Sequence, residues 1–526
     1  MDITLWIMII GWVFVLLWVP FIIYTNKGTH PKALFVLFFA EMWERFSYYG
    51  MRALLILYMT KVLFIDMAQN VAETKAYGIY GSYTAMVYLF PVLGGLVADR
   101  FLGFRKTILW GGILMALGHF TLALQGIEGL EGNLPFFFAA LALIIIGNAF
   151  FKPNISSFLG TFYEKDDPRK DGAFSIFYMG VNIGSFLSTL TCGYIGQQIN
   201  WHYGFGLAGI GMVLGLIIFW IFSRKFGEKG LPPKEVQEGS VKLFGRKPDM
   251  PIIVLSLLAV PVCASILDLD ELMSTLLLVI SIFIIAYLIY HAVTLKEKKE
   301  GQRLLVVVVL FFFHAIFWAL FEQAGGSLTL FADKNVNRVV GSTEIPASIF
   351  QSLNPLFIML LAPLFSYIWL KLNKAGKEPS TPMKFVLGLV QLSLGFGVIV
   401  LGARFFANDQ GLVSIIFLAV MYLLHTTGEL SLSPIGLSMV TKLSPAKIVG
   451  FVMGAWFLSI SLGNKIAGWI GKLTTSESID ENTPAAVTLT AYSDTYLVWG
   501  VGVVAGAALL LLLLVPLLKK WMHGIH

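Results

Sequence analysis

Apolar segments long enough to cross a lipid bilayer recur along almost the whole 526-residue chain. Hydrophobic residues make up 57% of the sequence and charged residues only 13%, which excludes a soluble globular protein. Because backbone polar groups inside a bilayer must be paired within the chain, the sequence predicts an all-α polytopic membrane protein. The two cysteines, Cys192 and Cys263, lie in apolar segments, so neither a disulfide framework nor a cysteine metal site is expected.

The predicted spans form two sets of six around a central insertion. The first set lies at about 33–62, 75–98, 106–126, 134–162, 172–199 and 203–223. The insertion consists of a polar linker at 224–250 and a two-helix hairpin at about 251–267 and 272–295. The second set lies at about 304–332, 345–371, 383–405, 412–441, 447–473 and 488–518. Two six-helix bundles with a substrate site near the midplane are typical of a transporter.

An additional apolar segment at 5–24 precedes the first set. It lacks the basic start and small-residue end of a secretory signal peptide, so we expect a retained extra transmembrane helix; an interfacial helix is the alternative. The predicted domain organisation is therefore an extra N-terminal helix at 1–28, a six-helix bundle at 29–223, a linker plus hairpin at 224–303, and a second six-helix bundle at 304–526.

Most Lys and Arg residues fall in alternate loops, and the remaining loops are acidic or neutral. Basic loops face the cytoplasm, so this pattern places the C-terminal end of the second bundle in the cytoplasm and the extreme N-terminus in the periplasm. We therefore expect a multi-pass protein of the cell inner membrane. The net charge of +6 reflects this orientation and gives no indication of nucleic-acid binding.

The segment 41–52 carries four charged residues, Glu41, Glu44, Arg45 and Arg52, inside an apolar run. Their spacing places them on one stripe of a helix, with two tyrosines nearby. A charged side chain at mid-bilayer costs at least ~2.5 kcal/mol, so these residues need mutual pairing or a water-filled cavity. The stripe therefore predicts a functional site.

Two alternatives remain for this stripe. The residues could lie at the membrane interface with the arginines extended towards the headgroups, although the short carboxylates lie too deep for this. They could also form a structural group of ion pairs that holds helices together, which is compatible with a functional role.

Three further charged residues lie inside predicted spans, Lys152 in the first set and Glu322 and Glu429 in the second. Lys152 precedes a proline, which frees backbone groups to line a cavity. Each bundle therefore carries buried charge, and Lys152 or Arg52 could pair with Glu322 or Glu429 to close one side of a cavity. The alternative is a static buried pair, which stabilises a fold poorly compared with apolar packing.

Three histidines in predicted spans, His119, His314 and His425, are expected to be hydrogen-bonded packing residues. His425 and Glu429 are four residues apart, but no metal site is expected from this pair alone. Lys465 is expected to lie near a cavity or the outer interface, and its sequence context assigns it no role.

The stretch Gly94-Gly95-Leu-Val-Ala-Asp99-Arg100 lies in the loop between the second and third spans of the first set. This pattern is typical of the major facilitator superfamily. We expect the two glycines to allow close helix approach and Asp99 to cap or pair at the cytoplasmic helix ends.

Five separated motifs resemble those of the proton-dependent oligopeptide transporters, the peptide branch of the major facilitator superfamily. They are Glu41-Met-Trp-Glu44-Arg45-Phe-Ser-Tyr-Tyr49-Gly, Phe151-Lys152-Pro153-Asn154, Phe177-Tyr178-Met-Gly-Val-Asn182, Phe317-Trp318-Ala-Leu-Phe-Glu322-Gln, and Gly428-Glu429-Leu-Ser-Leu-Ser433-Pro. Five motifs in the right order make the resemblance specific, and it extends along nearly the whole chain. The hairpin is similar to a pair of extra helices in bacterial members.

The resemblance implies a major facilitator fold and uptake of di- and tripeptides together with protons. It implies peptide carboxylate binding by Arg45, Tyr49 and Lys152, and amino-group binding by Glu429, Asn182 and Asn354. The other implied substrate-binding residues are Arg52, Tyr88, Tyr178, Trp318, Ser433 and Trp456. Proton coupling would involve Glu41, Glu44, Arg45 and Glu322, and the implied gate salt bridges are Arg52–Glu322 and Lys152–Glu429.

The sequence departs from the family in two places. Some members carry a histidine seven residues before the tyrosine that matches Tyr88, and this chain has Gly81 there. A mechanism that requires this histidine is not available, so proton coupling would rest on the carboxylates. Typical members also lack the segment at 5–24.

The sequence is compatible with three functions. A proton-coupled peptide symporter without a cofactor, metal or obligate protein partner is the main prediction. A carrier of another small zwitterion or anion is the first alternative, although Glu429 suits an amine better than an anion. An intramembrane enzyme that uses Glu41 and Glu44 as acid and base is the second, but no nucleophile or phosphate-binding loop accompanies these residues.

Overall fold

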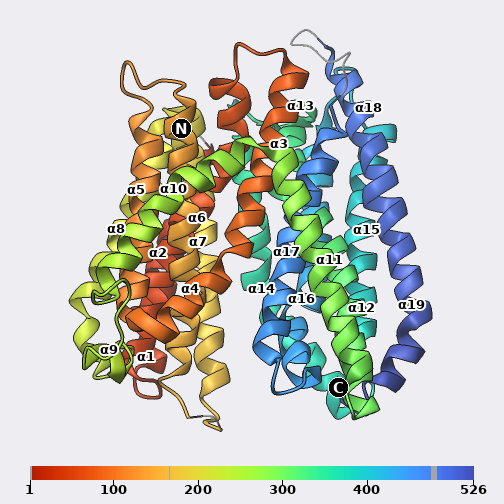
Figure 1. The fold of residues 1–526 in the computed structure, drawn as a ribbon. Coiled ribbons are helices and arrows are strands. Elements are labelled where there is room, and N and C mark those ends of the chain that lie inside the picture. The colour runs from red at the N-terminus through yellow and green to blue at the C-terminus, as the bar shows by residue number, and fades with distance from the viewer. Residues whose placement is uncertain (1–2, 165, 476–482, 526) are drawn as a thin grey trace. The chain divides into compact units, whose positions relative to one another are not determined.

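The structure, a computed structural model, describes residues 3–164, 166–475 and 483–525 and consists almost entirely of helices (Figure 1). The side chains of Ser433 and three neighbouring residues in the same helix also lie outside this description. The chain forms two compact units. Unit 1 comprises Met1–Tyr58, Leu89–Leu269 and Val339–Pro355, and unit 2 comprises Met59–Tyr88, Asp270–Arg338 and Leu356–His526.

Unit 1 is a group of helices with one short antiparallel pair of strands. Its α-helices are α1 (Ile3–Asn26), α2 (Lys32–Tyr58), α4 (Pro91–Val97), α5 (Gly103–Leu124), α6 (Leu134–Gly160), α7 (Lys170–Gln198), α8 (Trp201–Ile221), α9 (Lys234–Gln237) and α10 (Asp249–Asp268). Its other elements are the π-helical turn η2 (Ala98–Leu102), the 3-10 turns η3 (Ser223–Phe226) and η5 (Ala347–Ser352), and the paired strands β2 (Val339–Val340) and β3 (Thr343–Glu344).

Unit 2 is likewise helical, with one short parallel pair of strands. Its α-helices are α3 (Gln69–Leu89, except for its last residue), α11 (Asp270–Thr294), α12 (Lys298–Phe321), α13 (Ser327–Asn335), α14 (Leu353–Lys374, from Leu356), α15 (Thr381–Phe405), α16 (Ile415–Leu443), α17 (Val449–Lys472), α18 (Ala485–Thr495) and α19 (Val504–Trp521). Its other elements are the π-helical turns η1 (Met59–Leu63) and η6 (Tyr496–Val503), the 3-10 turn η4 (Glu322–Gly325), and the paired strands β1 (Val336–Asn337) and β4 (Val413–Ser414).

The helices confirm the predicted polytopic all-α fold. Thirteen helical segments in the described chain are long and apolar enough to cross a membrane, and the segment at 69–124 among them covers two predicted spans. The extra segment at 5–24 forms α1, which also has the required length and apolarity. Helix α2 is not among the thirteen because it is too rich in charged residues. Its charge therefore sets it apart from the other long helices.

Close backbone contact explains one of the two glycines in the predicted superfamily motif. A Cβ atom at Gly94 would collide with the carbonyl oxygen of Ala149, so this glycine lets α4 lie directly against α6. The expectation is wrong for Gly95, since a Cβ there would meet nothing within 4 Å. Only the first glycine is required for helix approach.

Helix α1 packs on α7 in unit 1. Trp12 donates a hydrogen bond from Nε1 to Thr191 Oγ1 at 2.9 Å, and its ring centroid lies 6.5 Å from that of Trp43 and 6.3 Å from that of Phe46, both on α2. The remaining surface of α1 is largely exposed and apolar. This helix therefore lies at the edge of unit 1, with most of its side chains exposed.

Helix α3 packs on α17 within unit 2 at Gly81. A Cβ atom at Gly81 would lie 3.1 Å from Gly468 Cα and 3.3 Å from the Asn464 carbonyl oxygen. Ser461 Oγ donates to the Ala85 carbonyl at 2.7 Å on the same contact surface. The two helices therefore lie too close for a large side chain at position 81.

The two units differ from the predicted domains at two segments. Met59–Tyr88 lies in unit 2, and Val339–Pro355 lies in unit 1. The hairpin is also divided, with α10 in unit 1 and α11 in unit 2. The units describe which segments pack together, whereas the predicted domains describe bundles that are continuous in sequence, and those domain boundaries stay a prediction.

Candidate functional site

Two carboxylates share one guanidinium group on α2. Arg45 donates from Nε to Glu41 Oε1 at 2.8 Å, and the same nitrogen lies 3.2 Å from Glu44 Oε2. Asn148 on α6 donates from Nδ2 to Glu44 Oε1 at 3.1 Å. Glu41 is 2% exposed, Glu44 0% and Arg45 7%. We call these four residues the α2 charge cluster.

The α2 charge cluster holds more negative than positive charge when both carboxylates are ionised. In the described part of the chain, Oε2 of Glu41 and Oε2 of Glu44 accept no hydrogen bond. A buried carboxylate oxygen without such a bond costs free energy, and a proton on one carboxylate would leave a neutral cluster. The arrangement can therefore take up a proton without leaving Arg45 unpaired.

The remaining charge of the predicted stripe lies next to an aromatic ring. Arg52 is 6% exposed, and its Cζ lies 5.8 Å from the centre of the Tyr49 ring. The rings of Tyr48 and Tyr49 are in edge contact at 5.2 Å. Because the charged residues of the stripe are enclosed by protein, the interfacial alternative for this segment is wrong. Their burial is compatible with a functional site and with a structural group of ion pairs.

The Lys152 motif connects α6 to α4 in unit 1. Asn154, two residues after Lys152, donates from Nδ2 to the Phe150 carbonyl at 2.7 Å and to the Gly94 carbonyl at 3.1 Å. Pro153 lies inside α6 without ending it. The side chain of Asn154 thus bonds α6 to α4, and Lys152 remains partly exposed on this helix.

The other predicted residues of unit 1 lie on α7 and at the start of α14. Asn182 is 5% exposed and donates from Nδ2 to the Tyr178 carbonyl at 2.9 Å. Tyr178 is 44% exposed, so its ring lies open on the same helix. Asn354 is partly exposed in the first turn of α14.

The predicted acidic residues of unit 2 are both buried. Glu322 is 4% exposed and begins the η4 turn after α12, and Glu429 is 8% exposed on α16. Gln323 holds η4 in place, because its Nε2 donates to the carbonyls of Ala319 and Ala467 at 3.0 and 3.1 Å. Tyr88 is partly exposed near the end of α3. The prediction for Ser433 concerns a side chain outside the described residues.

His314 connects the two tryptophans that were predicted to line the substrate site. Trp318 donates from Nε1 to His314 Nε2 at 2.8 Å, and the rings of His314 and Trp456 stack at 4.2 Å. The other ring nitrogen, Nδ1, lies 2.6 Å from Ser459 Oγ. His314 therefore fixes both tryptophan rings. The spacing of four residues between His314 and Trp318 is the one sequence signal that could have indicated this contact.

The histidine predictions are only partly confirmed. His314 is hydrogen-bonded and buried as expected. His119 is equally buried, but neither of its ring nitrogens has a hydrogen-bond partner in the described chain, so the expectation of hydrogen bonding is wrong there. Among the described residues, no group of His, Cys, Asp and Glu could hold a metal ion.

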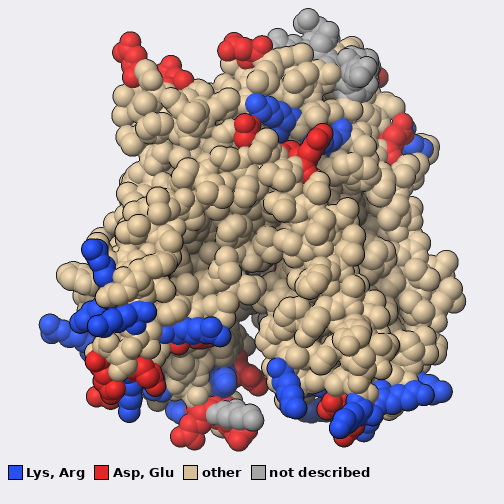
Figure 2. Space-filling model, in the orientation of Figure 1, with Lys and Arg blue, Asp and Glu red and all other residues tan. Residues whose placement is uncertain are grey.

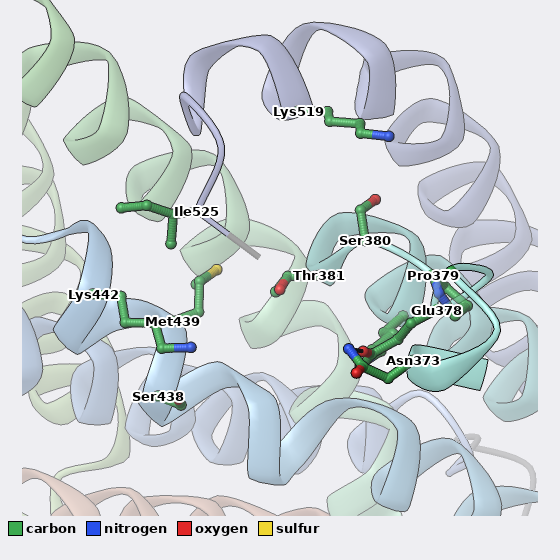
Figure 3. A pocket seen from close by; sticks show the side chains of 12 residues that line it. Asn373, Glu378, Pro379, Ser380, Thr381, Ser438, Met439, Lys442, Lys519 and Ile525 are labelled. Atoms are coloured by element: carbon green, nitrogen blue, oxygen red, sulfur yellow. Dashed lines mark hydrogen bonds and ion pairs between the residues drawn. The ribbon is translucent and has the colours of Figure 1, made fainter. Parts of the chain in front are cut away.

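A cavity of about 650 Å³ lies in unit 2 (Figure 3). Asn373, Glu378 and Thr381 border it on one side, and Met439 and Lys442 border it from α16. Lys384 also lines it and pairs with Glu378. It contains none of the predicted site residues, so it is not the predicted substrate site.

The predicted site residues fall in both units. The α2 charge cluster, Arg52, Lys152 and Asn182 belong to unit 1, while Glu322 and Glu429 belong to unit 2. The gate salt bridges Arg52–Glu322 and Lys152–Glu429 would each join the two units, and both stay predictions. Within the units, the structure brings together the α2 charge cluster and the His314 group.

Residues 105–488 match the POT family. The chain is 39% identical over 502 residues to the peptide transporter YePEPT of Yersinia enterocolitica, which covers 93% of this chain and 94% of that protein. The crystal structure of the peptide transporter POT in complex with sulfate has a TM-score of 0.78 and 35% identity, and covers 94% of this chain and 96% of that one. A POT family transporter in complex with 5-aminolevulinic acid has a TM-score of 0.77 and 30% identity, and covers 93% and 97%.

Proposed function

Because this chain belongs to the POT family of peptide transporters, we propose that it is a proton-coupled symporter that imports di- and tripeptides by alternating access. The chain is a multi-pass membrane transporter and not an enzyme. The single observation that carries the proposal of proton coupling is the α2 charge cluster, in which Glu41 and Glu44 share Arg45. A proton can neutralise this cluster without leaving a buried cation unpaired.

The proposed peptide-binding site recognises the opposite charges at the two ends of a peptide. Arg45, Lys152 and Tyr49 would bind the carboxylate, and Glu429, with Asn182 and Asn354, would bind the amino group. Such a site holds the peptide by its termini and does not depend on its sequence. The burial of Arg45 and Glu429 supports this proposal, because charge-assisted hydrogen bonds are strong in a site that excludes water.

The proposed walls of the site are aromatic. Trp318 and Trp456 are held by His314, and the other proposed lining residues are Tyr88, Tyr178, Ser433 and Arg52. Aromatic walls accept varied side chains without requiring particular hydrogen bonds. The site would therefore have broad specificity.

The proposed coupling joins protonation to closure of the site. Glu41, Glu44, Arg45 and Glu322 would respond to the proton, and the pairs Arg52–Glu322 and Lys152–Glu429 would form and break as the site opens to one side or the other. Protonation of a carboxylate removes its charge and releases its cation, so it shifts the balance between the two conformations. No cofactor takes part in this scheme.

A small zwitterion other than a peptide is the second candidate substrate. A relative with 30% identity is solved in complex with 5-aminolevulinic acid, which carries an amino group and a carboxylate as a peptide does. The same cations and the same carboxylate, Glu429, could bind such a molecule. Glu429 disfavours a simple anion as the substrate.

The proposed location is the cell inner membrane with the basic ends of the units in the cytoplasm. In unit 1 exposed lysines lie in the linker around α9, and in unit 2 they lie at the ends of α14 and α19. Figure 2 shows many Lys and Arg side chains, together with Asp and Glu, at the lower end of the view. This distribution supports the predicted cytoplasmic linker and a periplasmic N-terminus.

Uptake into liposomes tests the function directly. Purified protein in liposomes should accumulate a labelled dipeptide when the outside is more acidic than the inside, and tripeptides should compete with it. Free amino acids and 5-aminolevulinic acid serve as further competitors. Competition by 5-aminolevulinic acid alone would support the second candidate, and failure of every peptide to compete would end the peptide proposal.

Substitution of His314 by phenylalanine should lower both stability and discrimination between peptides. Trp318 Nε1 would lose its buried acceptor, which costs about 1–3 kcal/mol. We expect a lower thermal unfolding temperature, and a greater loss of affinity for dipeptides with bulky side chains than for dialanine. His119→Phe is the matched control because His119 is buried without a hydrogen-bond partner in the described chain. Equal effects of the two substitutions on dipeptide preference would show that His314 does not shape the site.

A further inference from the structure

The second helix of the hairpin begins with an aspartate that contacts two other helices. Asp270, the first residue of α11, pairs with Lys465 and with Lys472 of α17, and Lys472 Nζ lies 2.5 Å from Asp270 Oδ2. Ser82 of α3 donates from Oγ to Asp270 Oδ1 at 3.2 Å. All four residues belong to unit 2, and we call them the Asp270 cluster.

The surface of α3 is shaped to receive this aspartate. Gly78 lies one helical turn before Ser82, and a Cβ atom there would lie 3.0 Å from Asp270 Cγ. Lys465 is 8% exposed and also donates from Nζ to Ser82 Oγ at 2.7 Å. Lys465 therefore has two acceptors, and both depend on α3 and α11 staying next to α17.

The Asp270 cluster lies along the close contact between α3 and α17. On this contact Gly81 meets Gly468, and Ser461 donates to the Ala85 carbonyl. Because glycines have no side chains, they bring no charged group to this backbone contact that could hold the two helices together. The polar cluster supplies the charge-assisted bonds that hold the two helices together.

The two helices joined by the cluster come from different predicted bundles. Helix α3 lies in the sequence of the first bundle, 29–223, and α17 in that of the second, 304–526. The hairpin tip and the loops that precede α3 and follow α17 are among those predicted to be periplasmic. In alternating access the bundles must separate on one side and then on the other, so this contact has to open when the site faces the periplasm.

We propose that Asp270 is a positioning residue of the transport cycle, which stabilises the conformation closed to the periplasm by holding α3 against α17. This inference rests on the proposed transport function. Without the carboxylate, Lys465 and Lys472 would lie on the same contact with no anion between them, and Lys465 would be a buried cation that has lost its charged partner. The closed contact would then be less stable relative to the open one.

Helix α11 brings this aspartate to the contact within unit 2, and each helix of the hairpin is held within its own unit. Helix α10 is tied within unit 1, where Lys106 pairs with Asp249 and Trp110 donates from Nε1 to Ser256 Oγ at 3.0 Å. Helix α11 is tied within unit 2, where the rings of Tyr287 and Phe451 meet at 5.0 Å. The proposed role of the hairpin in transport is therefore to present Asp270 to α3 and α17.

Thiol labelling measures the opening of the contact without any substrate. Ser461→Cys places a thiol on the contact in a background with Cys192→Ser and Cys263→Ser, since both native cysteines are unpaired. A membrane-impermeant maleimide is added to the periplasmic side of right-side-out vesicles. We expect Asp270→Asn to increase the labelling rate about tenfold, because a lost hydrogen bond to a charged group changes an equilibrium by at least that factor.

Two further variants make the test decisive. Glu271→Gln removes the same charge from the next residue of α11, which is exposed, and should label at the parent rate. The double variant Asp270→Asn with Lys465→Gln removes both charges, so no buried lysine is left without its charged partner. It keeps the test valid if the single variant misfolds. This double variant should also label faster than the parent. An unchanged rate in the double variant, or an equal rise with Glu271→Gln, would overturn the inference.

Dipeptide uptake gives a second readout. A shift towards the conformation open to the periplasm should lower the KM for external dialanine, because a larger fraction of carriers is ready to bind it. It should also lower kcat, because the loaded carrier closes less readily. A residue that only anchors the hairpin would lower the amount of folded protein and leave KM unchanged. If labelling rises as expected but no peptide is transported, the proposed substrate is wrong while the role of Asp270 in closing the contact stands.

Discussion

Replacement of Glu44 by glutamine is expected to abolish uptake driven by a proton gradient and to leave exchange of peptide for peptide close to the parent rate. Exchange requires only that the loaded carrier changes conformation, whereas net uptake requires a proton to be bound and then released. Glutamine cannot release a proton, so the α2 charge cluster would stay in one protonation state. Glu44 is 0% exposed and bound by Asn148, a contact that glutamine can retain.

Both activities can be measured in the same liposomes. Net uptake is followed with an acidic exterior, and exchange is followed with equal pH and unlabelled peptide inside. Glu131→Gln, a substitution of an exposed loop residue, is the control for loss of a negative charge. Equal loss of uptake and exchange would make Glu44 a binding or folding residue and would remove the α2 charge cluster from the coupling mechanism.

Replacement of Glu429 by glutamine is expected to weaken binding of an ordinary dipeptide far more than binding of a dipeptide whose amino group is blocked. Glu429 is 8% exposed, so an ammonium group that meets it would do so with little water present. A charge-assisted hydrogen bond in such a site is worth ~1.5–3 kcal/mol, or roughly ten- to a hundredfold in affinity. Affinities of both peptides are measured for the parent and the variant.

The predicted partner of Glu429 requires a separate control. If Glu429 also pairs with Lys152, its loss would remove that partner from Lys152 and disturb the gate. The double variant Glu429→Gln with Lys152→Ala removes that cation as well. Equal loss of affinity for both peptides in the single variant, restored in the double variant, would assign Glu429 to the gate and not to the amino group.

The fold could be predicted from the sequence because bilayer thickness sets the length of each apolar segment. The sequence was also sufficient for the α2 charge cluster, since Glu41, Glu44 and Arg45 lie on one helix and local spacing decides which side chains meet. Asn148 could not be found in this way. It reaches Glu44 from α6, 104 positions along the chain, and only the packing of two helices brings them together.

The other features that the sequence did not predict also depend on how the helices pack against one another. The role of Lys465 depends on Ser82, 383 positions away, and on Asp270, 195 positions away, so its sequence context gave no indication of it. Gly95 was expected to resemble Gly94, but adjacent residues on a helix point about 100° apart and only one of them faces α6. Contacts between helices depend on orientation, which a run of apolar residues does not specify.

The contact between α1 and α2 has a consequence for how the chain is made. Helix α2 carries four buried charged residues, and charged residues inside a span disfavour entry from the translocon into lipid. Helix α1 precedes it, is strongly apolar and places Trp12 beside Trp43 and Phe46 of α2. We therefore expect α1 to enter the membrane first during synthesis and to offer the charged helix α2 an apolar surface on which to pack.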